Sequence, residues 1–328
     1  MKSMKSILLV LIVGCLSCLS LQAQKKCHIS AEIQGFTGGD MIYFDFMEKD
    51  GINQEFPYKE NQLMEFDVEL DDITMMKINA WVIICLEPGD NIHAKVTYVG
   101  NRYDAVEYTG TPRAVVVADY LHKVRALRAE RKYKTNIPAM MVLLYDAKEH
   151  YTATLKEWQD EIAMLDEIKG EISPRMYNYL LSEMEATLLT NLISYPYACS
   201  SYQKKKLEDC MADGYWGALD NYRLRDDEAS LRNRPYMGFL GTYKNYELGK
   251  KAHEKSETYT PAKNMEDEYG SIVAFYDGTL RDAALFVFLY NQVAGNKDFA
   301  TVEKLKKDYL KKYNKNKEYK KILADVMK

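Results

Sequence analysis

The sequence predicts an α+β protein in which an antiparallel, sandwich-like β domain is followed by a larger all-α domain. Hydrophobic residues alternate with polar ones from residue 27 to about 110, and they recur every three or four residues from 112 onward. A period of two is typical of half-buried strands, and a period near 3.6 is typical of amphipathic helices. We therefore expect the β domain to occupy 24–111 and the α-helical domain to occupy 112–328.

The first 23 residues have the pattern of a secretory signal peptide. Lys2 and Lys5 precede an apolar run over 7–21, and Ala23 comes directly before a polar segment. A basic region, an apolar core and a small residue at the cleavage site are typical of such peptides. We favour cleavage after Ala23, which predicts a periplasmic protein. The alternative is that the segment ending at Cys15 is a lipobox, in which case lipidation of Cys15 would attach the protein to a membrane.

Five segments with alternating or continuous hydrophobic residues predict strands in the β domain. They are bounded by Gly, Pro and Asp, which commonly end strands and form turns. About six or seven strands in roughly 85 residues indicate a small sandwich or a curled sheet. The clearest segments are 28–34, 41–46, 65–70, 77–86 and 91–96.

The segment Glu87–Asp90 predicts a tight turn between two of these strands. Pro88 sets φ to about −65° at the second turn position, and Gly89 can adopt the positive φ that a type II turn needs at the third. A well-formed turn needs no ligand. We therefore expect Pro88, Gly89 and Asp90 to have a structural role.

Helical periodicity begins after Gly110, where Thr111 suits the N-cap position and Pro112 the first helical position. The segment 283–293 is apolar nearly all round, which predicts the centre of the helical core. The segment 214–231 has the composition of a longer polar connection. The predicted helices begin at 112, near 144 and at 174, and continue at about 203–212, 232–254, 265–294, 299–313 and 316–327.

Four of the six cysteines lie outside the expected signal peptide. An exported protein can form disulfides, and Cys27 with Cys85 and Cys199 with Cys210 is one arrangement of two bonds. The spacing alone does not decide the connectivity. No C-x-x-C motif occurs outside the signal peptide, so we expect no redox motif in the mature chain.

No motif for catalysis, metal binding or cofactor binding is visible. The sequence has no H-E-x-x-H, no G-x-S-x-G, no phosphate-binding loop and no dinucleotide-binding glycine pattern. We therefore expect no catalytic residue, no metal and no cofactor. The five histidines are scattered: we expect His28 and His93 on the solvent-facing sides of strands, and His122, His150 and His253 on charged helix faces.

The charge distribution argues against a nucleic-acid partner. The formal net charge is −4, and both signs are mixed along most of the chain. The stretch 304–321 is basic, and we favour a solvated helix face over a phosphate-binding patch. For the 26 tyrosines, we favour positions between core and solvent over the lining of a carbohydrate or peptide groove.

Several stretches resemble a family of exported thiol–disulfide oxidoreductases of Gram-negative bacteria, which belong to the thioredoxin superfamily. EIQGFTGGDMIYFDF, VIICLEPGDNIHAKV and VEYTGTPRA resemble the β-rich amino-terminal domain of that family, a domain of unknown function. RPYMGFLGTYKNYELGKK, GTLRDAALFVFLYNQV and the closing LKKDYLKKYNKNKEYKKI resemble the helical spacer that follows it. In the family a thioredoxin domain with a W-C-x-x-C site comes next, and this chain ends where that domain would begin.

These observations predict an exported, non-catalytic protein of the cell envelope that works as a binding or interaction module. The ligand or partner is not indicated by the sequence. The alternative is a thiol–disulfide redox participant, which would act with a separate thioredoxin domain or through Cys199 and Cys210. The absence of a C-x-x-C motif from the mature sequence favours the binding module.

Overall fold

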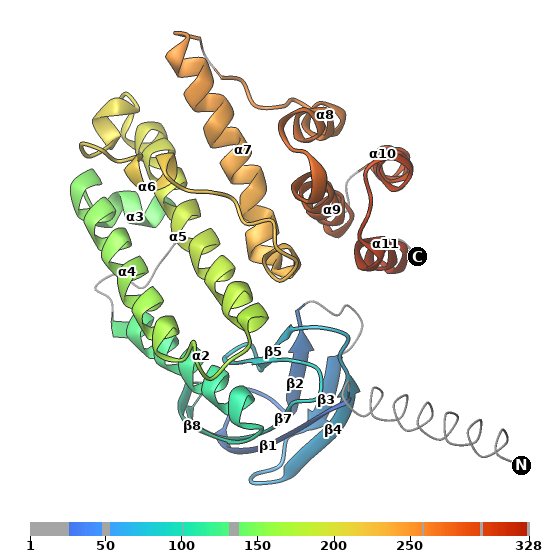
Figure 1. Cartoon of the computed structure of the whole chain (residues 1–328). Coiled ribbons are helices and arrows are strands. Elements are labelled where there is room, and N and C mark those ends of the chain that lie inside the picture. Colours follow the sequence, from blue (N-terminus) through green and yellow to red (C-terminus); the bar gives the residue numbers. More distant parts are fainter. Residues whose placement is uncertain are drawn as a thin grey trace, which may run out of the picture. The chain divides into compact units, whose positions relative to one another are not determined.

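The structure is a computed structural model that describes residues 26–47, 53–100, 102–130, 138–257, 259–295 and 298–326. The expected signal peptide, with Cys15, lies outside the described residues. The predicted fold class is confirmed, because a β region with two sheets is followed by a larger helical part (Figure 1).

Eight strands form two four-stranded sheets in the described residues. The strand order is β4-β1-β7-β8 in the first sheet and β3-β2-β5-β6 in the second. The strands are β1 (Lys26–Phe36), β2 (Met41–Phe46), β3 (Asn53–Pro57), β4 (Leu63–Glu69), β5 (Thr74–Ile78), β6 (Val82–Leu86), β7 (Asn91–Gly100) and β8 (Arg102–Gly110).

Among the described strands, all neighbouring pairs except one are antiparallel, which corrects the expectation of a purely antiparallel domain. β1 and β7 run parallel, with Ile29 opposite Ile92 and Ile33 opposite Val96. Parallel neighbours need a long connection, and here the segment from β2 to β6 supplies it: β2, β3, β5 and β6 form the second sheet, and β4 pairs with the other side of β1. Alternation within a strand does not reveal the direction of its neighbour, so the sequence could not predict this pair.

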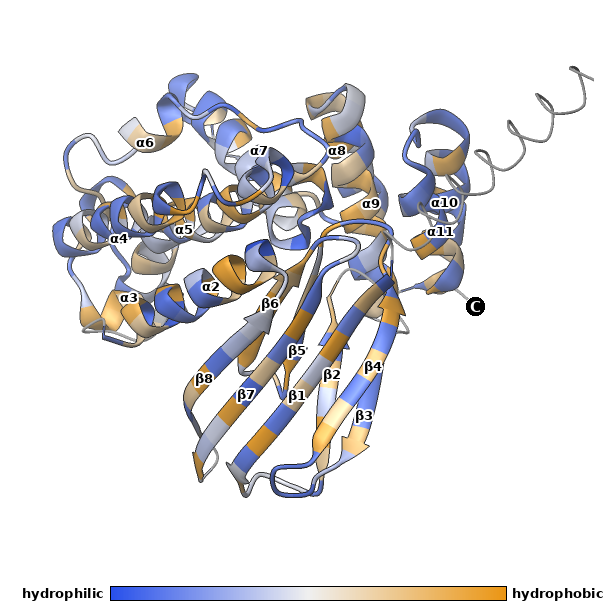
Figure 2. Ribbon diagram, turned by 60° about the horizontal axis from the view of Figure 1, so that its bottom comes forward, coloured by the Kyte–Doolittle hydropathy of each residue, from blue (hydrophilic) through white to orange (hydrophobic). Residues whose placement is uncertain are grey.

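The strand alternation creates the core of the β region. Ile29, Ala31 and Ile33 of β1 are buried together with Ile92 and Val96 of β7. Figure 2 shows the same pattern as alternating hydrophobic and hydrophilic bands along β1 and β7. The apolar residues on one side of each strand are thereby removed from water, which stabilises the fold by about 25 cal/mol per Å² of buried apolar area.

From Pro112 onward, all the regular structure in the described residues is helical, as predicted. Two short 3₁₀ helices, η1 (Glu208–Cys210) and η2 (Ser230–Arg232), interrupt the α-helices. The α-helices are α2 (Pro112–Glu130), α3 (Pro138–Leu144), α4 (Ala147–Glu167), α5 (Pro174–Gln203), α6 (Gly217–Asp220), α7 (Arg234–Glu254), α8 (Met265–Phe275), α9 (Gly278–Ala294), α10 (Phe299–Lys312) and α11 (Lys317–Asp325).

Two predicted helices were wrong. The helix expected at about 203–212 is instead the end of α5, a loop and η1, and Lys204 has a positive φ of 55° that ends the helical path. The run expected over 265–294 is divided into α8 and α9. Tyr276 is extended between them, and its hydroxyl donates to the carbonyl of Leu240 at 2.7 Å. Tertiary contacts of a buried tyrosine therefore override the local helical pattern.

The predicted centre of the helical core is confirmed in α9, where Ala283, Leu285 and Leu289 are fully buried. The basic carboxyl-terminal helices pack into the same core. Phe286 of α9 stacks on Tyr319 of α11, with ring centroids 4.2 Å apart, and Tyr309 of α10 is fully buried. The last described helices are thus part of the folded helical structure.

The described chain divides into two compact units, and they do not separate at Thr111. One unit contains the described residues up to Leu127 together with Ile168–Met176; the other contains Arg128–Glu167 and the residues from Tyr177 onward. In the first unit, Arg175 pairs with Asp72 at 2.8 Å. The start of α5 is therefore fixed to the β region by an ion pair.

Candidate functional site

The turn at Glu87–Asp90 has the geometry that the sequence predicts. Gly89 has a φ of 86°, and the N–H of Asp90 donates to the carbonyl of Glu87 at 3.1 Å. The N–H of Glu87 in turn donates to Oδ2 of Asp90 at 2.7 Å. The turn therefore closes on itself through both backbone and side-chain hydrogen bonds.

Arg113 of α2 fixes this turn to the helix that follows the β region. Its Nε donates to Oδ1 of Asp90 at 2.7 Å, and its Nη2 donates to the carbonyl of Pro88 at 3.2 Å. Burial raises the pKa of the Asp90 carboxyl, while the N–H of Glu87 and the guanidinium of Arg113 lower it. Both carboxylate oxygens are used within the fold, which supports the structural role expected for Pro88, Gly89 and Asp90.

The four cysteines of the described residues fall into two kinds. Cys199 and Cys210 are joined by a disulfide, with their Cα atoms 5.8 Å apart. Cys27 and Cys85 are buried thiols on different sheets, so the arrangement with a Cys27–Cys85 bond does not occur. Burial raises the pKa of the Cys27 thiol, and a protonated thiol is a poor nucleophile.

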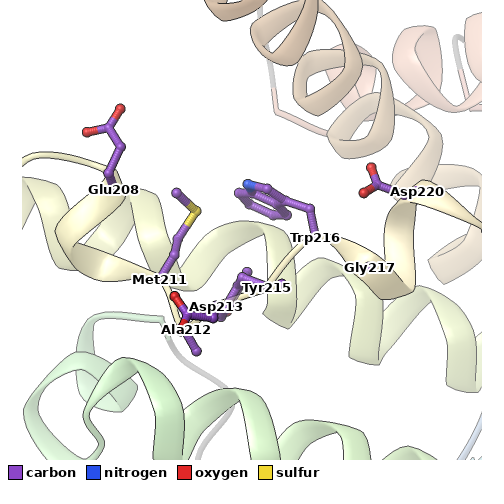
Figure 3. A pocket seen from close by; sticks show the side chains of 9 residues that line it. Glu208, Met211, Ala212, Asp213, Tyr215, Trp216, Gly217 and Asp220 are labelled. Carbon is purple, nitrogen blue, oxygen red and sulfur yellow. The ribbon is translucent and has the colours of Figure 1, made fainter.

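The disulfide lies beside a pocket of about 430 Å³ in the helical unit. The residues that form the wall of the pocket begin in η1 and end in α6. One short segment of the chain therefore supplies the whole lining (Figure 3). The lining residues are Glu208, Met211, Ala212, Asp213, Gly214, Tyr215, Trp216, Gly217 and Asp220. Cys210 itself is fully buried, and its bond to Cys199 ties this wall to the end of α5.

Trp216 has the largest side chain of the pocket lining. Its side chain is half-buried and projects on the same side of the segment as Met211 (Figure 3). The ring of Tyr215 packs edge to face against the indole, with ring centroids 5.1 Å apart. The ring centroid of Tyr246, from α7, lies 4.8 Å from that of the indole. Tyr215 and Tyr246 are both buried, so the indole rests on a fixed aromatic support.

A buried histidine, His150, contacts the hydroxyl of Tyr215. Nδ1 of His150 and the hydroxyl of Tyr215 are 3.1 Å apart, and the imidazole stacks on Tyr195 with centroids 4.0 Å apart. His150 is 1% exposed, so the prediction that it lies on a charged helix face was wrong. Burial lowers the pKa of His150 to about 4, which keeps the imidazole neutral near pH 7.

The charged side chains of the pocket lining are all carboxylates. Within the described residues, the side chains of Glu208 and Asp213 have no hydrogen bond or ion pair, whereas Asp220 pairs with Lys250. The lining includes no Lys, Arg, His, Asn or Gln. Ionised carboxylates only accept hydrogen bonds. The pocket therefore offers an aromatic surface and acceptors to a ligand that supplies donors.

The described part of the chain has no group of three or more His, Cys, Asp or Glu arranged to hold a metal ion. None of its helices combines the length and the apolar character needed to cross a membrane. No protein-family model matches the chain, and comparisons with curated proteins and with solved structures give no match.

The sequence predicted the turn residues and offered Cys199 with Cys210 as one possible pairing, but it did not single out the pocket. The lining was divided between a predicted helix and a polar connection. One local signal was present: the run from Cys210 to Asp220 combines two adjacent aromatic residues with glycine and acidic residues. Glycine and acidic residues are typical of irregular surface segments, and a Tyr-Trp pair is unusual in a segment of that composition.

Proposed function

We propose that this protein is an exported, non-catalytic binding protein of the cell envelope, and that it binds through the pocket at Trp216. The disulfide between Cys199 and Cys210 supports export, because such bonds persist in oxidising compartments and are rare in the cytosol. The signal-peptide pattern of the first 23 residues supports the same compartment.

The observation that carries the binding role is the half-buried indole of Trp216 in a pocket whose lining also has carboxylates with no partner in the described residues. A fixed aromatic face attracts cations by about 0.5–2 kcal/mol. Glu208 and Asp213 add acceptors of the opposite charge. The preferred ligand group is therefore an ammonium or guanidinium group, carried by a small amine or by a lysine or arginine of a partner protein.

Tryptophan fluorescence tests this function with three cationic probes, spermidine, arginine amide and choline, and with glucose as a neutral probe. We expect a saturable change with the cations and none with glucose, with affinities of about 1 mM for a single cation–π contact with two weak ion pairs. The variant Trp216→Phe should lose the change.

The matched control is Trp81→Phe, which alters the 48% exposed Trp81 of the β region and should retain the fluorescence change. The proposed function is contradicted if no cation produces a saturable change. It is equally contradicted if the change persists in Trp216→Phe.

The second candidate function is thiol–disulfide exchange, which the presence of the Cys199–Cys210 bond favours. Exchange requires a thiolate to reach one of the sulfur atoms, and Cys199 and Cys210 are 4% and 0% exposed. We therefore expect the protein not to accelerate thiol-dependent reduction of insulin. Turnover that disappears in Cys199→Ala or Cys210→Ala would establish the redox role instead. In a further form of this candidate, which follows from the family resemblance, the protein acts in thiol–disulfide exchange together with a separate thioredoxin domain.

A further inference from the structure

Positive charge is concentrated in the last two described helices. Residues 298–326 contain nine lysines, five acidic residues and no arginine, which gives them a net charge of +4. The whole chain carries −4, so the remaining residues together carry −8. The carboxyl-terminal helices thus differ in sign from the rest of the protein.

The lysines gather on the sides of α10 and α11 that point away from the core. In α10 the buried residues are Val302, Leu305 and Tyr309. Positions 304, 307 and 311 lie on the opposite side of the helix at 3.6 residues per turn, and all three are exposed. In α11 the buried residues are Tyr319 and Leu323, and the exposed lysines are Lys317, Lys320 and Lys321.

The two helices form a fixed pair. They lie side by side in both views of the chain (Figures 1 and 2). Asp282 of α9 accepts hydrogen bonds from the N–H groups of Lys315 and Asn316, at 2.8 and 2.9 Å, and from the hydroxyl of Tyr309. This buried carboxylate holds the connection between α10 and α11, so the two lysine-bearing sides keep one arrangement.

Most of these lysines are not neutralised by acids of the described chain. Lys304, Lys306 and Lys312 have ion pairs with Glu266, Glu303 and Asp308. Six more lysines have no ion pair within the described residues: Lys307, Lys311, Lys315, Lys317, Lys320 and Lys321. We call these six residues the lysine surface.

The composition of the lysine surface favours a bilayer over a stereospecific partner. Arginine is the residue suited to bidentate recognition of phosphates or carboxylates, whereas lysine acts as a mobile point charge. Clusters of four to eight basic residues commonly attract anionic lipids. Phe299, at the beginning of α10, is 58% exposed and supplies an apolar group of the kind that enters the membrane interface.

We propose that the lysine surface docks the protein onto an anionic phospholipid bilayer. The attraction is electrostatic and acts within about 10 Å at 0.1 M salt. It is independent of the pocket at Trp216 and of any lipid attached to Cys15, and it would hold an exported protein at the membrane face.

Vesicle sedimentation tests the proposal with the purified protein. We expect binding to vesicles of phosphatidylcholine containing 30% phosphatidylglycerol at low salt, weak binding to pure phosphatidylcholine, and loss of binding as salt is raised. The variant Lys307→Gln/Lys311→Gln/Lys320→Gln/Lys321→Gln should partition about tenfold or more less strongly into the anionic vesicles.

The matched control is Lys148→Gln/Lys205→Gln/Lys206→Gln/Lys255→Gln, which removes four exposed lysines from the same unit and should bind as the wild type does. The proposal is overturned by equal binding to both kinds of vesicle, by unchanged binding of the first variant, or by an equal loss in the control. Binding to single-stranded DNA with the same affinity and the same lysine dependence would also overturn it, because it would indicate a general polyanion site.

Discussion

Position 89 requires glycine because of a single backbone dihedral, the φ of this residue. Its φ of 86° lies in the left-handed region, which a β-branched side chain adopts only with strain. The neighbouring Asp90 depends on that conformation, because its carboxylate must reach both Glu87 and Arg113.

We predict that Gly89→Val lowers the free energy of unfolding by about 1–3 kcal/mol through this strain. Urea denaturation followed by circular dichroism measures the change. Gly170→Val is the matched control, because Gly170 does not have a positive φ and a Cβ there meets nothing within 4 Å. Equal stability of the Gly89 variant and the wild type would refute the strain at this turn.

His150 should make stability depend on pH. The unfolded imidazole has a pKa of about 6.5, and burial lowers the folded value to about 4. The unfolded state therefore binds more protons between these values, and the free energy of unfolding falls as pH is lowered from about 6.5 to about 4. The loss attributable to this group is at most about 3 kcal/mol.

The measurement is urea denaturation at several pH values for the wild type and for His150→Gln. The stability difference between the two should shrink as pH falls through this window. His253→Gln, which removes an exposed imidazole, is the matched control. A difference that stays constant with pH would show that His150 is not held neutral by burial.

At the scale of elements, the disulfide organises the irregular segment between α5 and α7. Cys199 lies near the end of α5, Cys210 closes η1, and the pocket lining continues to α6. This is also where prediction from the sequence failed. The lysine-rich segment after Gln203 has good helix-forming residues, but the bond to Cys199 and the positive φ of Lys204 redirect the chain.

We predict that the double variant Cys199→Ala/Cys210→Ala is less stable by about 2–3 kcal/mol, because the bond closes a loop with a sequence separation of 11. Denaturation curves measure the loss. Wild-type protein treated with a reductant should match the variant once a thiol assay shows that the bond is reduced. If complete reduction leaves the wild-type curve unchanged, the bond does not stabilise the fold.

At the scale of the whole molecule, the period of the hydrophobic residues was sufficient to predict strands before Thr111 and helices after it. The turn at Gly89 was predictable because its signal is local. The parallel pairing of β1 with β7 and the burial of His150 were not, because each depends on residues more than 60 positions away: Ile29 pairs with Ile92, and His150 contacts Tyr215. The pocket was missed because it also depends on a tertiary contact, in which Tyr246 of α7 supports Trp216.

The proposed cation site consists of Trp216 and the carboxylates of Glu208 and Asp213. Its most direct test is the affinity for spermidine of Glu208→Gln/Asp213→Asn, measured by tryptophan fluorescence against the wild type and against Glu254→Gln/Glu257→Gln, which neutralises two exposed acids elsewhere. We expect the pocket variant to bind about tenfold more weakly and the control variant to bind like the wild type. Equal affinity of the pocket variant and the wild type would contradict the proposed site.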